Sequence, residues 1–113
     1  MMTSHLTTHV LDASAGHPAA GITVLLEHRA ETGWREVATG TTNADGRIAD
    51  LGPERLGSGT YRLTFAVADY FAATGTPTFY PEITVTFAVD EGQQHYHVPL
   101  LLSPFAYSTY RGS

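Results

Sequence analysis

Short alternating segments separated by frequent turns are the feature that most limits what this chain can fold into. Apolar and polar residues alternate over residues 61–67 and again over residues 83–89, a period of two that is typical of strands burying one face. Similar segments cover residues 5–12, 22–28, 34–42 and 48–51, and two more flank Ser103-Pro104. About seven to eight short strands with turns every eight to twelve residues predict an all-β fold, an antiparallel β-sandwich.

Residues 68–74 are the one segment in which we expect a helix. The segment is rich in Ala, Asp69 lies in its first turn, and Gly75 and Pro77 follow it. An acidic first turn with Gly and Pro just beyond the end is typical of a short helix.

The composition bounds the class of protein. At 113 residues we expect a single domain spanning residues 1–113. There is no cysteine, which excludes disulfides and thiolate metal sites and suits a reducing compartment. All six basic residues are Arg, and the formal net charge is −5, which argues against nucleic acid as a partner. With no membrane-spanning apolar run and no secretory start, we predict a soluble cytoplasmic protein.

The last nineteen residues, 95–113, combine two polar features with an apolar hairpin. His95 and His97 are two residues apart, so on a strand they project from one face. Alone, this pair would equally fit two solvated surface histidines. The polar cluster at 110–113 follows an apolar run that includes several Tyr. Together, the two features indicate a functional site.

The motifs at both ends of the chain resemble one family. His95-Tyr-His-Val-Pro-Leu and the terminal Tyr110-Arg-Gly-Ser113 resemble a signature of the 5-hydroxyisourate hydrolases, the transthyretin-related enzymes of purine breakdown. Leu6-Thr-Thr-His-Val-Leu-Asp12, followed by Gly16-His-Pro-Ala-Ala-Gly21, is similar to that family's other signature, and Asp45-Gly-Arg47 matches between them. The resemblance covers nearly the whole chain. It implies a transthyretin-like sandwich that assembles as a homotetramer, a dimer of dimers, with sites in channels between subunits.

The resemblance also implies a reaction, the hydrolysis of 5-hydroxyisourate to 2-oxo-4-hydroxy-4-carboxy-5-ureidoimidazoline, with no cofactor. Our hypothesis assigns His9 and His97 to water activation and proton relay, since imidazole can take and give a proton near neutral pH. It assigns Arg47 to binding the carbonyl-rich ring and stabilising negative charge. The strong Asp-Gly turn before Arg47 predicts a fixed backbone position for it. Which histidine is the general base is left open.

The tail is expected to complete the site. We predict that Tyr110 and Arg111 bind the substrate and that Ser113 joins the catalytic group by holding the substrate or tuning a histidine. The roles of His5 and His95 are left open.

A zinc site is the alternative interpretation of the histidines. His95 and His97 with His9 offer three imidazoles if their strands are adjacent, but a clear carboxylate or cysteine fourth ligand is missing. We therefore predict a metal-free mechanism.

Two other functions compete with hydrolysis. A carrier such as transthyretin proper has the same sandwich, but carriers depart from the enzyme pattern at the first-strand His, the Arg after the turn, the His-x-His and the terminal tetrapeptide, all of which this chain keeps. An immunoglobulin-like structural domain is disfavoured by the lack of cysteine and would leave the polar tail unexplained.

The final hairpin is apolar on both faces, which bears on assembly. One face carries Tyr96, Val98, Leu100 and Leu102, and the other carries Leu101, Phe105 and Tyr107. A strand that is wet on one face should be polar there. We therefore expect another subunit to cover the second face; the alternative is burial within one sandwich.

Overall fold

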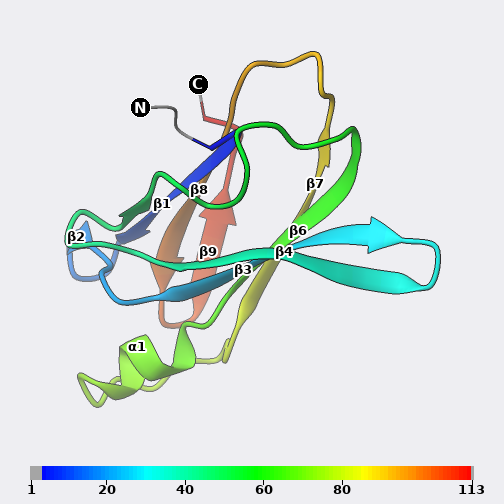
Figure 1. The fold of residues 1–113 in the computed structure, drawn as a ribbon. Coiled ribbons are helices and arrows are strands. Elements are labelled where there is room, and N and C mark those ends of the chain that lie inside the picture. The colour runs from blue at the N-terminus through cyan, green and yellow to red at the C-terminus, as the bar shows by residue number, and fades with distance from the viewer. Residues whose placement is uncertain (1–3, 113) are drawn as a thin grey trace.

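The computed structural model describes residues 4–112 and consists of two β-sheets packed face to face, with one short helix at the side (Figure 1). The elements follow one another as β1 (Leu6–Asp12), β2 (His17–Pro18), β3 (Thr23–Ala30), β4 (Gly33–Thr41), β5 (Arg47–Ile48), β6 (Gly59–Phe65), α1 (Ala68–Ala72), β7 (Ile83–Val89), β8 (Tyr96–Ser103) and β9 (Ala106–Thr109). The predicted β-sandwich with one helix is confirmed.

The two sheets differ in how their strands pair. Sheet A has the order β2-β1-β8-β9 with β5 also paired to β1, and sheet B has the order β4-β3-β6-β7. The expectation of a purely antiparallel sandwich was wrong in one place, because β1 and β8 pair in parallel. These strands are separated by all of sheet B in the chain, so no hairpin forces them to be antiparallel.

The strand count also differs from the prediction. Residues 4–112 contain nine strands rather than seven to eight. One addition is β2, which forms where we expected only a turn, because Leu11 and Asp12 pair with Pro18 and His17. Two-residue strands of this kind carry no alternating pattern that a sequence could reveal.

The core lies between the sheets and follows the period of two. Sheet A buries Leu6, Val10, Val98, Leu100 and Leu102, and sheet B buries Val24, Leu26, Leu63, Phe65 and Ile83. On β1, buried and half-buried residues alternate strictly. The side chains of Thr7 and His9 are therefore on the outer face of sheet A, opposite to the core.

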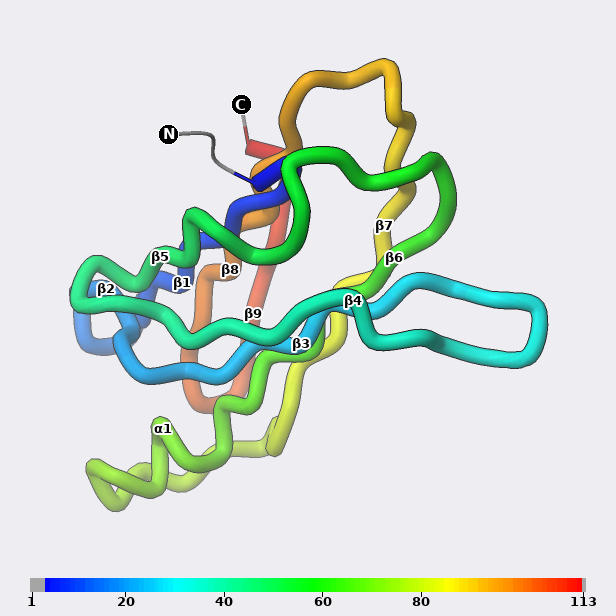
Figure 2. The backbone as a smooth tube through the Cα atoms, viewed as in Figure 1, coloured from blue at the N-terminus to red at the C-terminus, as the bar shows by residue number. Residues whose placement is uncertain are grey.

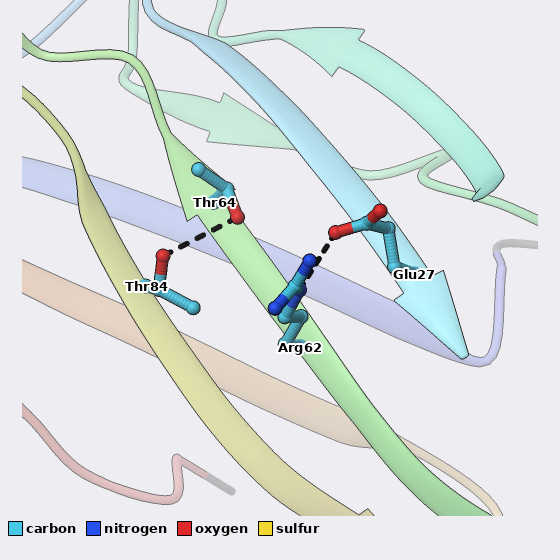
Figure 3. Close-up of polar contacts among 4 residues, drawn as sticks. All are labelled: Glu27, Arg62, Thr64 and Thr84. Atoms are coloured by element: carbon cyan, nitrogen blue, oxygen red, sulfur yellow. Dashed lines mark hydrogen bonds and ion pairs between the residues drawn. The ribbon is translucent and has the colours of Figure 1, made fainter. Parts of the chain in front are cut away.

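The outer face of sheet B is held by cross-strand polar pairs (Figure 3). Glu27 and Arg62 are directly opposite each other on β3 and β6, and Arg62 Nε lies 2.7 Å from Glu27 Oε1. Thr64 and Thr84 pair in the same way on β6 and β7, with 3.4 Å between their hydroxyl oxygens. Opposed pairs of this kind are the usual means by which a solvated sheet face is stabilised.

The helix α1 is shorter than the predicted segment 68–74. It ends at Ala72, after which the amide of Thr76 and the side chain of Thr74 both bond to the Phe71 carbonyl. Gly75 then adopts a φ of 64°, a left-handed conformation that suits glycine. Phe71 is buried and anchors the helix to the core. Among the described residues, no helix is long and apolar enough to cross a membrane.

The β8–β9 hairpin buries only one of its two apolar faces. Its inner face is in the core, as predicted, but β9 is an edge strand with every residue exposed. Phe105 is 66% exposed and Tyr107 is 41% exposed. The alternative of burial within one sandwich is therefore wrong for the outer face, which this chain alone does not cover.

Candidate active site

Strands from opposite ends of the chain meet at the site. Figure 2 shows β1 and β8 side by side, and their parallel register places Thr7 opposite His97 and His9 opposite Pro99. Because residues two apart share a face, the register puts Thr7, His9 and His97 on the outer face of sheet A. The sequence pattern alone did not reveal this pairing.

Arg47 reaches the same face from a locked turn. The Asn43 side-chain oxygen accepts hydrogen bonds from the amides of Asp45 and Arg47, at 2.9 and 3.0 Å. Gly46 has a φ of 74°, and a Cβ there would collide with the Val10 carbonyl oxygen, so only glycine fits. β5 then pairs Arg47 directly with His9 on β1. The expected fixing of the Arg47 backbone by the turn agrees with this geometry.

A small cavity opens beside these groups. Its volume is about 240 Å³, and it is lined by Thr7, Thr8, Arg47, Ile48, Ala49, His95 and His97. The Thr7 hydroxyl oxygen lies 2.9 Å from His95 Nε2 and 2.8 Å from His97 Nδ1. Two imidazoles are therefore held by one hydroxyl at the wall of the cavity.

The surroundings of His97 favour its neutral form. Burial lowers the pKa of His97 below its ordinary value of 6.5, and unfavourable electrostatic interactions with Arg47, His9 and His95 lower it further. A hydrogen bond with the Thr7 backbone acts in the opposite direction but is the smallest influence. This lowering of the pKa favours the unprotonated ring, which is the form that can accept a proton.

The chain returns to the site just before its end. Gly112 pairs with His97, and its amide donates a 2.8 Å hydrogen bond to the His97 carbonyl. A Cβ on Gly112 would lie only 2.6 Å from His97 Cδ2. The backbone of the tail is thus packed directly against the His97 side chain. Ser113, which we predicted to be catalytic, lies outside the described residues.

Tyr110 and Arg111, which we predict to bind the substrate, lie beside Tyr96 and β7 within one chain. Arg111 stacks over the Tyr96 ring at 4.7 Å, and its Nη2 is 3.4 Å from Gln93 Oε1. Tyr110 is 58% exposed. Both line a separate cavity of about 320 Å³ between β7 and β9. Within one chain, they therefore lie in a cavity different from the one that His97 lines.

The structure gives the locations of His5 and His95, whose roles the sequence analysis left open. His95 is exposed and bonds to Thr7. His5 is only 1% exposed, with Nε2 2.7 Å from the Gln93 carbonyl oxygen and Nδ1 accepting from the Leu56 amide at 2.9 Å. His5 therefore ties two loops to β1 and belongs to the structure rather than to the cavity.

The residue that sequence reasoning missed is Thr7. Its only signal was its place two residues before His9 on a strand, which put both on one face. In the part of the chain that the structure describes, no group of three or more His, Cys, Asp or Glu side chains could hold a metal ion. The alternative zinc site of His9, His95 and His97 is thus not formed there.

The fold is a two-sheet sandwich, and a cavity lined by imidazole and guanidinium groups opens on the outer face of sheet A. Similarity to known proteins shows which class of protein has these features. Residues 6–112 match the HIUase/Transthyretin family. The chain belongs to that family.

Individual relatives and solved structures are similar to this chain. The 5-hydroxyisourate hydrolase of Salmonella dublin is 48% identical over 96% of this chain and 80% of its own length. Among solved structures, the 5-hydroxyisourate hydrolase of Klebsiella pneumoniae has a TM-score of 0.84 at 40% identity, covering 98% of this chain and 99% of that one. Transthyretin from Sparus aurata has a TM-score of 0.90 at 33% identity, covering 96% of each chain. The backbone is thus shared by a 5-hydroxyisourate hydrolase and a transthyretin, so the side chains must distinguish the two.

Proposed function

We propose that this protein hydrolyses 5-hydroxyisourate, the substrate in the name of its 48%-identical relative, and that the product is 2-oxo-4-hydroxy-4-carboxy-5-ureidoimidazoline. The observation that carries the proposal is the convergence of His9, Arg47 and His97 from three strands on one face of sheet A. These are the groups that a metal-free hydrolysis of a cyclic amide requires: a base, a proton carrier and a fixed positive charge.

The reaction adds one water across a ring C–N bond. A neutral imidazole removes a proton from water as its oxygen attacks the ring carbonyl carbon. The carbonyl oxygen becomes negative, and Arg47 offers a permanent charge to stabilise it. When the C–N bond breaks, the nitrogen takes a proton and leaves as part of the ureido group. We assign the proton transfers to His9 and His97, of which His97 has the lowered pKa that suits a base.

Assembly completes the proposal. We infer a homotetramer, a dimer of dimers, because the edge strand β9 is exposed along its whole length and large apolar side chains surround it. These are Phe79, Phe105, Tyr107 and Tyr110, which are between 41% and 70% exposed. Clusters of exposed aromatic residues are typical of subunit interfaces. Sedimentation or light scattering at micromolar concentration would give a monomer mass if this were wrong.

The remaining roles follow from assembly and composition. We propose that Tyr110 and Arg111 contribute to substrate binding through the assembled form, since within one chain they line another cavity. Ser113 follows Gly112, which is bonded to His97, and we keep it as a catalytic candidate. We also propose a single domain in the cytoplasm, for which the absence of cysteine is suitable.

The test is a spectrophotometric assay in which urate oxidase generates the unstable substrate and its decay is followed with and without this protein. Replacing His9, Arg47 or His97 with Ala should each lower turnover by about 10²-fold. His17→Ala is the matched control, because His17 is exposed on β2, pairs with Asp12 rather than with Arg47, and lines a different cavity. Near-normal turnover in any of the three variants would remove that residue from the mechanism.

A carrier function is the second candidate, supported by the similarity to transthyretin from Sparus aurata. It predicts that the wild-type protein binds small aromatic ligands and leaves the decay of 5-hydroxyisourate unchanged. Equal decay rates with and without the protein would favour it over hydrolysis.

A further inference from the structure

One hydroxyl group joins two histidines at the cavity. Thr7 Oγ1 lies 2.8 Å from His97 Nδ1 and 2.9 Å from His95 Nε2. Both are good hydrogen-bond distances. The arrangement follows from the parallel register, which sets Thr7 directly opposite His97 and leaves His95 just before the start of β8.

A threonine hydroxyl has one proton, which links the states of the two rings. It can donate to only one of the two imidazole nitrogens, so the other nitrogen must carry a proton and donate to the hydroxyl oxygen. Two arrangements satisfy both contacts when the hydroxyl proton lies between the two rings. In the first, His97 Nδ1–H donates to Thr7 and Thr7 donates to His95 Nε2. In the second, both directions are reversed, and His97 then carries its proton on Nε2.

Only the first arrangement makes His97 a base. With the proton held on Nδ1 by Thr7, the lone pair of His97 Nε2 is free to take a proton from water. In the second arrangement Nε2 is already protonated and cannot do so. The hydrolysis proposed above needs a free imidazole nitrogen at His97, and of these two arrangements only the first provides it.

We propose that Thr7 is a positioning residue that holds His97 in the Nδ1–H tautomer, with His95 as the acceptor of the Thr7 proton. This role corresponds to that of the residue that orients the histidine in other hydrolytic sites, but here the orienting group is a neutral hydroxyl. It also gives the exposed His95 a function, since an unprotonated Nε2 accepts the Thr7 proton and leaves the hydroxyl oxygen to accept from His97. The inference rests on the hydrolase function proposed above.

The test combines kinetics with a direct reading of the tautomer. Nitrogen-15 NMR of the imidazole rings distinguishes protonated from unprotonated nitrogens, and it needs no turnover. In the wild-type protein at pH 8, we expect His97 to carry its proton on Nδ1. In Thr7→Val the signal should shift toward Nε2–H, and kcat should fall by about tenfold or more with KM changed much less. Thr7→Ser keeps the hydroxyl and should restore most of both.

A matched control distinguishes the loss of the Thr7 hydroxyl from the general effect of replacing a strand threonine with valine. Thr64→Val removes a hydroxyl on the outer face of the other sheet, where Thr64 pairs with Thr84 (Figure 3), and should leave kcat and the His97 tautomer unchanged.

The outcomes distinguish this inference from the proposed function. A wild-type His97 found as the Nε2–H tautomer would overturn the positioning role, even if Thr7→Val failed to fold. An active wild type in which Thr7→Val retains both tautomer and kcat would also overturn it. An inactive wild type with His97 in the Nδ1–H form would instead refute the hydrolase proposal while leaving the hydrogen-bond assignment intact.

Discussion

Gly112→Ala tests whether the tail holds the His97 ring in place. A Cβ at this position would lie 2.6 Å from His97 Cδ2, 3.2 Å from Cγ and 3.3 Å from Cβ. Ordinary contacts begin at 3.4 Å, so the nearest pair overlaps by about 0.8 Å. The terminal backbone and the imidazole cannot both keep their places.

Either way of relieving the overlap disturbs the site. If the ring turns, it leaves the Thr7 hydroxyl, which now lies 2.8 Å from Nδ1. If the tail moves, the 2.8 Å bond from the Gly112 amide to the His97 carbonyl is lost, at a net cost of about 1 kcal/mol. A displacement approaching 1 Å at a catalytic group can lower the rate about 10²-fold. We expect kcat to fall by about 10- to 100-fold, with little change in global stability.

The assay is the coupled decay of 5-hydroxyisourate, measured beside urea unfolding. Gly57→Ala is the matched control, because a Cβ at Gly57 meets nothing within 4 Å. It should leave kcat unchanged. If Gly112→Ala kept kcat within about twofold of the wild type, the tail would not be packed on His97 in the working enzyme, and the steric reasoning would be refuted.

Two further predictions concern charge and hydrogen bonding. Burial is the largest cause of the lowered pKa of His97, and the positive charge of Arg47 is the second. Arg47→Gln removes that charge, so an NMR titration should show the pKa of His97 rising. An unchanged pKa would contradict the electrostatic reasoning. Because the folded-state pKa of His97 is below 6.5, its contribution also makes the fold less stable as pH falls below 6.5 toward the folded value. Tyr70→Phe removes a 2.7 Å hydrogen bond to Asp12 Oδ2 and should cost about 1–2 kcal/mol in urea unfolding at pH 7. Burial raises the pKa of Asp12, but hydrogen bonds from Ser14 and then Tyr70 lower it more. The stability lost in Tyr70→Phe should therefore shrink as pH falls through that lowered pKa. A loss of stability that did not depend on pH would argue against an ionised acceptor.

Local patterns predicted the strands and the turn before Arg47. The alternation of residues 61–67 predicted which face of β6 is buried, and Leu63 and Phe65 are fully buried as expected. The Asp-Gly pair predicted a tight turn, and Gly46 has the positive φ that such a turn needs. These features depend on residues adjacent in the chain, so the sequence contains the information directly.

Two histidines that the alternating pattern places on one face of a strand, His5 and His9, lie in different surroundings in the structure. The sequence pattern did not distinguish them. His5 and His9 share a face if the strand begins at residue 5. In the structure, His5 precedes β1 and is buried between loops, whereas His9 lies on the outer face of sheet A. The difference arises from bonds to Leu56 and Gln93, far away in the chain. A strand alternation with a period of two residues depends on near neighbours, so it cannot predict contacts between residues so far apart in the chain.

The sequence by itself determined the fold class, the turn that precedes Arg47 and the presence of imidazoles near both ends of the chain, because propensity and alternation act between near neighbours. Tertiary structure alone decided that β1 and β8 run in parallel, that Thr7 therefore faces His97, and that Tyr110 and Arg111 line a different cavity. The physical reason is that strand pairing is a choice among distant partners, and a shift of one residue in register would move every side chain to the other face of the sheet.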